Sequence, residues 1–232
     1  MVTVNNFFDE VFVLNLNRSY DRWKKTRIRL RRENIFYKRI TGIDKVMPSL
    51  KTEFQKHKKR TTTKIRTIGR YAVWRSFSKM FEHILDYNYK KILIFEDDVT
   101  FHKKFDYLFD LTINKYLPKT WDMWYLGATQ VNWRNIKVEN EFPLYHPTGN
   151  TFGMFAVAFN VDFIRKNYKY YKRGGQNNDH FWSQMKNYDN IYVSYPRLCG
   201  HDTGFSINAG YEITDSIADR LVYFKYDKNI YY

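Results

Sequence analysis

The stretch KILIFEDDVTF, residues 91–101, decides the fold of this chain. Its first part, 92–95, is a continuous apolar run rich in β-branched and aromatic side chains, which predicts a strand buried on both faces, as inside a parallel sheet. Three carboxylates follow without a gap: Glu96, Asp97 and Asp98. Because ligands of open α/β sheets bind beyond the carboxyl ends of the strands, we expect a binding site at this acidic edge.

Adjacent carboxylates repel one another, so a positive group is expected beside these three residues. Mg²⁺ and Mn²⁺ suit such a place, since both prefer carboxylate and phosphate oxygens. Acidic strand ends that only face water are also common. The triplet alone therefore leaves two interpretations open: a site for a metal or cationic ligand, or a solvated strand end.

The composition predicts a globular protein from a reducing compartment. A chain of 232 residues forms one large domain or two small ones, and a hydrophobic fraction of 44% is enough to build a core. The single cysteine, Cys199, cannot form an internal disulfide and is expected to be a small buried side chain. No basic-then-apolar leader is present and no run reaches the ~18 apolar residues of a membrane span, so we expect a soluble, cytoplasmic protein.

The net charge of +15, from 39 basic and 24 acidic residues, indicates an anionic partner. Nucleic acid, a membrane surface and phosphorylated substrates all fit, and the aromatic residues could provide stacking platforms for bases. However, the basic residues are scattered over many segments, and a coding bias of the genome would produce a similar composition. The charge therefore does not choose among these partners.

A strand, a turn and a helix are expected near the N-terminus. The apolar run 11–14 is followed by a polar turn and by Ser19, a residue type that caps helix N-termini. A phosphate or nucleotide can bind where a strand leads through a turn into a helix, and Arg18 and Arg22 lie close enough in sequence to contribute. A solvated basic helix explains the same residues equally well.

The rest of the chain alternates helical and strand patterns, which predicts an α/β fold. Strands are expected at 36–40, 121–127, 151–160 and 191–195, and helices at 71–86, 105–116 and 161–171. Residues 45–70 are polar, basic and without strong periodicity, so we expect a long surface segment, either a substrate lid or a solvated loop. The tail, 211–232, contains no motif that indicates a function.

Two residues late in the chain are candidates for chemistry. Asn178 can cap a helix whose first turn contains Asp179, and the positive helix end favours an ionised carboxylate that could accept a proton from a substrate hydroxyl. An Asp that only complements the helix dipole is the alternative. His201, expected in a loop, is either polar surface or a further ligand of a carboxylate-bound metal.

The order of these segments resembles glycosyltransferase family 25, which includes bacterial lipopolysaccharide glycosyltransferases and procollagen galactosyltransferases. Residues 11–22, VFVLNLNRSYDR, resemble the opening strand of that family and its NLDRS-x-DR turn. Residues 92–99, ILIFEDDV, resemble ALILEDDV, the family's form of the DxD metal motif, and WDMWYLG at 121–127 is similar to WDIIYLG. The likeness extends over 9–207, and the shared order and spacing of the pieces make it specific.

One motif departs from this family. The family usually has GExGCxLSH before the long helix, whereas this chain has TIGRYAVW at 67–74 and keeps only Gly69. Val73 and Trp74 stand where Ser and His are expected, so any hydroxyl or imidazole role at that place is lost. This departure leaves open a different donor or acceptor preference, and weak or absent activity.

The resemblance implies one GT-A domain over 1–232, a Rossmann-like α/β sandwich with a mostly parallel central sheet flanked by helices. It implies inverting transfer of a hexose, galactose or glucose, from a UDP-sugar to a hydroxyl of a glycan or protein acceptor, with Mn²⁺ or Mg²⁺ as cofactor. A retaining route through a carboxylate nucleophile stays open.

The resemblance also implies roles for particular residues. The expected metal ligands are Glu96, Asp98 and His201. The residues expected to hold the nucleotide sugar are Asn17, Arg18, Arg22, Glu96 (toward the ribose) and Asp97 (toward the sugar or the backbone). Asp179 is the candidate base that deprotonates the acceptor hydroxyl.

Two other functions remain open at this point. Another metal-dependent, nucleotide-using transferase is possible because an acidic strand end suits phosphoryl chemistry as well. A non-catalytic binder of nucleic acid or an anionic glycan would explain the net charge, although nothing in the sequence points firmly to nucleic acid. The oligomeric state is not indicated.

Overall fold

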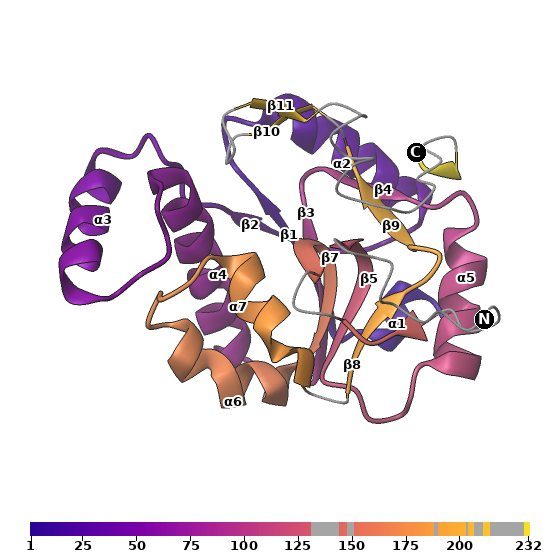
Figure 1. Ribbon diagram of the computed structural model, residues 1–232. Coiled ribbons are helices and arrows are strands. Elements are labelled where there is room, and N and C mark those ends of the chain that lie inside the picture. Colours follow the sequence, from indigo (N-terminus) through magenta and orange to yellow (C-terminus); the bar gives the residue numbers. More distant parts are fainter. Residues whose placement is uncertain (131–143, 148–150, 188–189, 203, 207–210, 214–229) are drawn as a thin grey trace.

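A seven-stranded sheet forms the centre of the structure, a computed structural model that describes residues 1–130, 144–147, 151–187, 190–202, 204–206, 211–213 and 230–232. The strands lie in the order β2-β1-β3-β7-β5-β8-β6 (Figure 1). They are β1 (Glu10–Asn15), β2 (Lys38–Thr41), β3 (Lys91–Glu96), β5 (Met123–Gln130), β6 (Leu144–Tyr145), β7 (Thr151–Asn160) and β8 (Ile191–Ser194). Strands β6 and β7 run against the other strands, so the sheet is mostly parallel, as expected.

Helices cover both faces of this sheet (Figure 1). One face carries α3 (Pro48–Arg60), α4 (Ile68–Asp86), α6 (Val161–Tyr171) and α7 (Asn178–Ser183), and the other carries α1 (Val4–Phe7), α2 (Tyr20–Arg32) and α5 (Phe105–Leu111). Ile92 and Ile94 of β3 pack in the core below the first group, whereas Leu93 and Phe95 pack in the core below the second. Successive strand residues point to opposite faces, so a strand covered on both sides is apolar throughout.

The strands that follow β1 in the sequence lie on opposite sides of it, β2 on one side and β3 on the other. Strands β2 and β3 lie on either side of β1 and both run parallel to it. The boundary between β1 and β3 is therefore a topological switch point, where a crevice opens beyond the carboxyl ends of the strands. Leu14 pairs with Glu96 in the register of the two strands, so the turn that leaves β1 lies next to the acidic triplet.

Several elements have the expected bounds. Strand β7 and helix α6 coincide with the predicted ranges, and α4 begins only three residues before the predicted start. Helix α5 continues into a π-helical turn, Thr112–Tyr116, so a helical segment covers the predicted range before Pro118. Strand β5 begins two residues later than predicted and continues past Gly127 to Gln130, where Thr129 and Gln130 pair with β7.

The structure corrects two expectations. Much of the segment 45–70 is not a solvated loop, because α3 forms there and buries Leu50 and Phe54. These two side chains are four residues apart and so lie on one helix face, and the ring of Phe54 lies 5.1 Å from that of Tyr71 in α4. His201 is not in a loop but ends strand β9 (Cys199–His201), which pairs antiparallel with β4 (Val99–Phe101).

The C-terminal part returns to the acidic edge. Strand β10 (Gly204–Ser206) pairs with β11 (Tyr211–Ile213), and Tyr232 exchanges two backbone hydrogen bonds with Phe101. The intervening tail, 214–229, lies outside the described residues. Cys199 is buried and free, as predicted. Among the helices that the structure describes, none combines the length and the apolar character needed to cross a bilayer.

Candidate active site

The acidic residues that follow β3 share one arginine. Arg22, in the first turn of α2, places its Nη2 atom 2.7 Å from Asp97 Oδ1 and 2.6 Å from Asp98 Oδ2. Burial by itself would lower the pKa of Arg22, but the charges of Asp98 and Asp97 outweigh it and raise this pKa above its ordinary value. The positive partner that the carboxylate triplet requires is thus supplied, in part, by the chain itself.

Asp97 is the most firmly held carboxylate of the triplet. Its side chain is 9% exposed, and Asn15 Nδ2 donates to its Oδ2 at 2.6 Å. Arg39 donates to the amide oxygen of the same Asn15, which fixes the orientation of the amide. Burial raises the pKa of Asp97, and the charge of Arg22 opposes this rise. These contacts turn the carboxylate of Asp97 toward β1 and α2.

One face of α2 contacts Asp97, Asp98 and Val99 of the acidic loop, residues 96–99. Thr26 Oγ1 donates to the carbonyl oxygen of Asp97 at 2.7 Å. Arg29 forms two parallel bonds to the carboxylate of Asp202, at 2.7 and 2.8 Å, and also donates to the carbonyl oxygen of Val99. Thr26 and Arg29 follow Arg22 by four and seven residues, the spacing of one helix face. The backbone of Asp202 in turn donates to the carbonyl oxygen of Asp98 at 2.7 Å, which ties the end of β9 to the loop.

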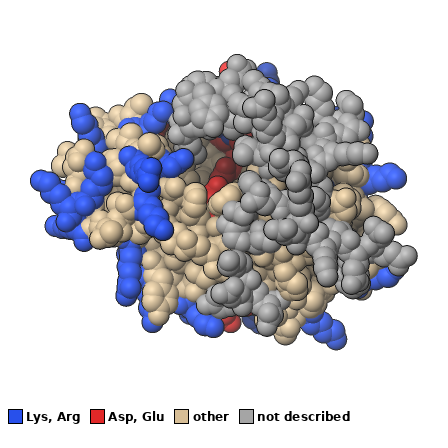
Figure 2. Space-filling view, viewed as in Figure 1, with Lys and Arg blue, Asp and Glu red and all other residues tan. Residues whose placement is uncertain are grey.

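The negative charges of Glu96, Asp98 and Asp179 are balanced less completely by nearby positive groups than that of Asp97 is. Burial raises the pKa of Glu96 well above its ordinary value, and the negative charges of Asp98, Asp179 and Asp97 raise it further. Asp179, some eighty residues away in sequence, therefore lies within electrostatic reach of the acidic loop. Asp98 Oδ1 is buried and has no hydrogen-bond partner among the described residues. Figure 2 shows acidic side chains at the bottom of a hollow.

Asp179 lies in the first turn of α7, as predicted, although the helix begins differently. Asn177, and not Asn178, occupies the N-cap position, and its side chain makes no capping hydrogen bond. Burial raises the pKa of Asp179, while His180, a backbone hydrogen bond from Gly153 and the charge of Arg70 oppose the rise. The effect of burial on the pKa of Asp179 thus exceeds that of the helix N-terminus, which was expected to favour the ionised carboxylate. To act as a base, the carboxyl group must be ionised.

Asn17 and Arg18 lie in the turn after β1. Asn17 Oδ1 accepts a hydrogen bond from Arg39 at 3.0 Å, and the guanidinium of Arg18 pairs with Asp44 at 2.5 Å. Both residues follow the carboxyl end of β1, and their partners Arg39 and Asp44 lie on β2 and in the segment after it. Their predicted role in holding a nucleotide stays a prediction.

His201 is drawn to the site by the pairing of β9 with β4. Its register partner is Val99, next to Asp98, and its ring packs 5.0 Å from that of Phe155. Its Nδ1 lies 3.1 Å from the carbonyl oxygen of Asp202. Within the described ranges, no three His, Cys, Asp or Glu side chains are grouped so as to hold a metal ion. The set of Glu96, Asp98 and His201 therefore stays a prediction.

Five residues that shape the site were not among the sequence candidates: Asn15, Thr26, Arg29, Arg39 and Asp202. Thr26 and Arg29 carried a usable signal, because their spacing from Arg22 places all three on one face of a predicted helix. Arg39 and Asp202 carried none, since each reaches the site only through the arrangement of strands distant in sequence.

A mostly parallel sheet with helices on both faces, and with carboxylates at the switch point between β1 and β3, is a Rossmann-like fold of the glycosyltransferase type. Residues 8–232 match the family described as "Glycosyltransferase family 25 (LPS biosynthesis protein)", and the chain belongs to this family. It is also similar to a Bos taurus protein named "Probable inactive glycosyltransferase 25 family member 3", with 27% identity over 174 residues. The matched part covers 68% of this chain but only 28% of that relative.

Proposed function

We propose that this protein transfers a hexose, galactose or glucose, from a UDP-sugar to a hydroxyl group of a glycan or protein acceptor. The observation that carries the proposal is the acidic loop at the switch point of a family 25 chain, with a buried carboxylate oxygen, Asp98 Oδ1, left without a partner among the described residues. A buried acceptor atom of this kind is costly unless a cation or donor completes it.

A divalent cation fits the chemistry of these residues. Glu96 and Asp98 offer hard oxygen ligands. Burial, and after it the negative charges of Asp98, Asp179 and Asp97, raise the pKa of Glu96, and a cation would relieve the repulsion among these charges. His201, on the strand beside Asp98, is the third ligand that we propose. When bound, Mn²⁺ or Mg²⁺ would neutralise the charge that develops on the departing diphosphate.

The residues of β1 and α2 are proposed to bind the nucleotide. Asn17 and Arg18 would contact the nucleoside and its phosphates from the turn after β1, as at other strand–turn–helix phosphate sites. Arg22 orients Asp97 and Asp98 through its two ion pairs and places positive charge at the loop. Asp97, held by Asn15, would act through the backbone shape of the loop.

Asp179 is proposed as the base. Its carboxylate would take the proton of the acceptor hydroxyl while the hydroxyl oxygen attacks the anomeric carbon and UDP departs with the bonding electron pair. The raised pKa of Asp179 brings its basicity closer to neutral pH, which suits proton transfer from a hydroxyl. Attack from the face opposite to UDP would give inversion.

The experiment measures UDP binding by calorimetry and UDP release with Mn²⁺, for the wild type and for Asp98→Asn. We expect metal-dependent UDP binding in the wild type, at least a tenfold loss in Asp98→Asn, and no loss in the control Asp162→Asn, whose carboxylate is on the surface of α6. Wild-type binding that is indifferent to metal, or an Asp98→Asn variant with unchanged release, would contradict the proposal.

A binding protein without turnover is the second candidate. It is favoured by the replacement of the family's Ser and His by Val73 and Trp74 and by the name of the bovine relative. This candidate predicts metal-dependent UDP binding without release of UDP from any UDP-hexose in the presence of acceptors. Release of UDP that depends on both a sugar donor and an acceptor would exclude it, and would also exclude a phosphotransferase.

A further inference from the structure

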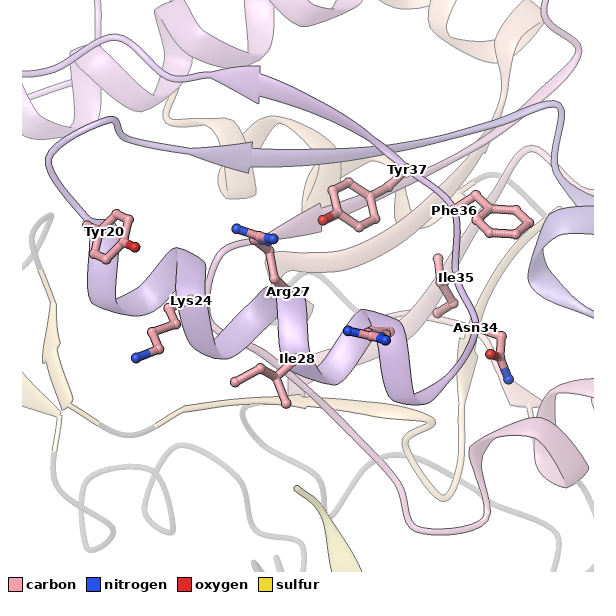
Figure 3. Close-up of a pocket in the computed structure, with 9 residues that line it drawn as sticks. Tyr20, Lys24, Arg27, Ile28, Asn34, Ile35, Phe36 and Tyr37 are labelled. Atoms are coloured by element: carbon pink, nitrogen blue, oxygen red, sulfur yellow. The ribbon is translucent and has the colours of Figure 1, made fainter.

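An open groove lies along the outer side of α2 and the segment that follows this helix. It encloses about 520 Å³. Its lining consists of Tyr20, Lys24, Arg27, Ile28, Arg31, Asn34, Ile35, Phe36 and Tyr37, drawn in Figure 3. No acidic residue lines the groove, and none of the proposed site residues belongs to it.

The groove occupies the face of α2 that points away from the acidic loop. Tyr20, Lys24, Arg27 and Arg31 recur at intervals of three or four residues and so form one stripe along the helix. At about 100° of rotation per residue, this stripe is centred on the side opposite to Arg22, which points into the site. One face of α2 thus contacts the acidic loop, and the opposite face lines the groove.

Large apolar side chains that line the groove are exposed. Tyr20 is 67% exposed, Ile28 is 58% exposed and Phe36 is 78% exposed. Phe36 is not exposed because its backbone is loose: Asn5 accepts a hydrogen bond from its amide at 2.9 Å, and the preceding Ile35 is 4% exposed. The chain therefore presents this ring to solvent from a fixed backbone.

The cations of the groove have no anionic partner in the described part of the chain. Lys24, Arg27 and Arg31 are exposed, and none of them forms an ion pair with a described residue. In contrast, Arg22 and Arg29 on the inner face are both paired. The outer face of α2 therefore combines unpaired positive charge with exposed apolar groups.

We propose that this groove docks the protein on the surface of a membrane that contains anionic phospholipids. Basic side chains next to exposed aromatic and aliphatic groups on one helix face are the composition of interfacial helices, which combine attraction to anionic headgroups with shallow apolar insertion. A nucleic acid would also be attracted by Lys24, Arg27 and Arg31. It could also stack bases on Tyr20 and Phe36, whereas the exposed aliphatic Ile28 suits shallow insertion into lipid and not base stacking, so competition by RNA is an outcome of the test.

The test measures sedimentation of the full chain with phosphatidylcholine vesicles that contain or lack phosphatidylglycerol. The cation variant is Lys24→Gln/Arg27→Gln/Arg31→Gln, and its matched control is Lys51→Gln/Lys56→Gln/Lys59→Gln on the exposed side of α3. The apolar variant is Ile28→Ser/Phe36→Ser, and its control is Val46→Ser/Met47→Ser, which are also exposed.

We expect the wild type to bind only the anionic vesicles. Binding should fall roughly 100-fold in the cation variant, from about 1 kcal/mol for each cation near an anionic surface, and much less in the α3 control. It should fall roughly tenfold in the apolar variant and remain unchanged in its control. Absence of vesicle binding by the wild type overturns the proposal. Equal losses in the cation variant and the α3 control, or full binding by the apolar variant together with competition by single-stranded RNA, also overturn it, since they indicate non-specific attraction to polyanions.

Discussion

Replacing Arg22 by Gln would test whether this arginine holds the acidic loop together. Its Nη2 atom bridges Asp97 and Asp98 at 2.7 and 2.6 Å, and the side chain of Asp97 is almost fully buried. Removal of one partner of a fully buried ion pair costs about 3–5 kcal/mol. Since the Arg22 side chain is 34% exposed, water screens part of this interaction, and we expect a loss of about 2 kcal/mol in the free energy of unfolding near neutral pH.

The pH dependence of this loss follows from the carboxylates. Without Arg22, nothing opposes the effect of burial on Asp97 except its hydrogen bonds, so its pKa in the folded variant rises further above the unfolded value. A group with a raised folded-state pKa stabilises the protein fully below its unfolded pKa and loses this contribution as the pH rises through its folded pKa. The difference between wild type and Arg22→Gln is therefore largest at neutral pH and shrinks as the pH falls toward about 4.

Urea denaturation at a series of pH values, followed by tryptophan fluorescence, measures both effects. Arg27→Gln is the matched control, because Arg27 lies on the outer face of the same helix without an ion pair to a described residue, and a change within about 0.5 kcal/mol is expected there. If Arg22→Gln changed the unfolding free energy no more than this control, or by the same amount at every pH, the arginine would not be the counter-charge of the loop.

Three further outcomes are expected. Burial and the charge of Asp106 raise the pKa of Glu33 to about 7, so the stability of the wild type should fall as the pH rises from about 4.5 to about 7, and Glu33→Gln should remove this fall and stabilise the protein at pH 8 by up to about 3 kcal/mol in urea denaturation. Asp179→Asn should abolish acceptor-dependent UDP release while thermal denaturation shows no loss of stability, because burial disfavours the charge that the amide lacks; full activity would show that Asp179 is not the base. Gly127→Ala should destabilise the fold by about 3 kcal/mol or more in urea denaturation, since the added Cβ would lie 2.0 Å from the carbonyl oxygen of Cys199, and a change below about 1 kcal/mol would show that the strands shift easily.

The sequence predicted the elements whose burial is strongest. The β3 strand, β7, α6 and the long helix α4 are apolar on the faces that they bury, so their pattern matches the structure closely. Helix α3 escaped prediction because only Leu50 and Phe54 of its thirteen residues are buried, and its remaining side chains are polar and basic. Its helical state is decided by packing on α4, which the local sequence does not contain.

Candidate site residues could be predicted only where a local sequence pattern points to them. The acidic triplet, Arg22 and Asp179 were singled out from local patterns, and the structure brings all of them to one edge of the sheet. The strand position of His201 could not be foreseen, because β9 has three residues and exists only through its pairing with β4. Short strands of this kind are fixed by non-local hydrogen bonds and not by their own composition.

The departure from the family at Trp74 is best understood through the turn that precedes α7. The indole of Trp74 donates to the carbonyl oxygen of Tyr171 at 3.1 Å, and its ring lies so close to Gly174 that a Cβ there would approach within 2.8 Å. Gly174 has a φ of +64°, a conformation that favours glycine, and its carbonyl oxygen accepts a hydrogen bond from Thr63.

Trp74 therefore supports the connection between α6 and α7, the helix that carries Asp179. The hydrogen bonds and the ion pair that Asn15, Thr26 and Arg22 make to the acidic loop do not involve this tryptophan. The replacement of the family's His by Trp74 thus exchanges an imidazole for a ring that packs at the connection between α6 and α7, and the loop contacts from Asn15, Arg22 and Thr26 do not depend on it. The contacts that hold the acidic loop are thus independent of this replacement, and the behaviour of Asp98 and Asp179 decides whether the chain is active.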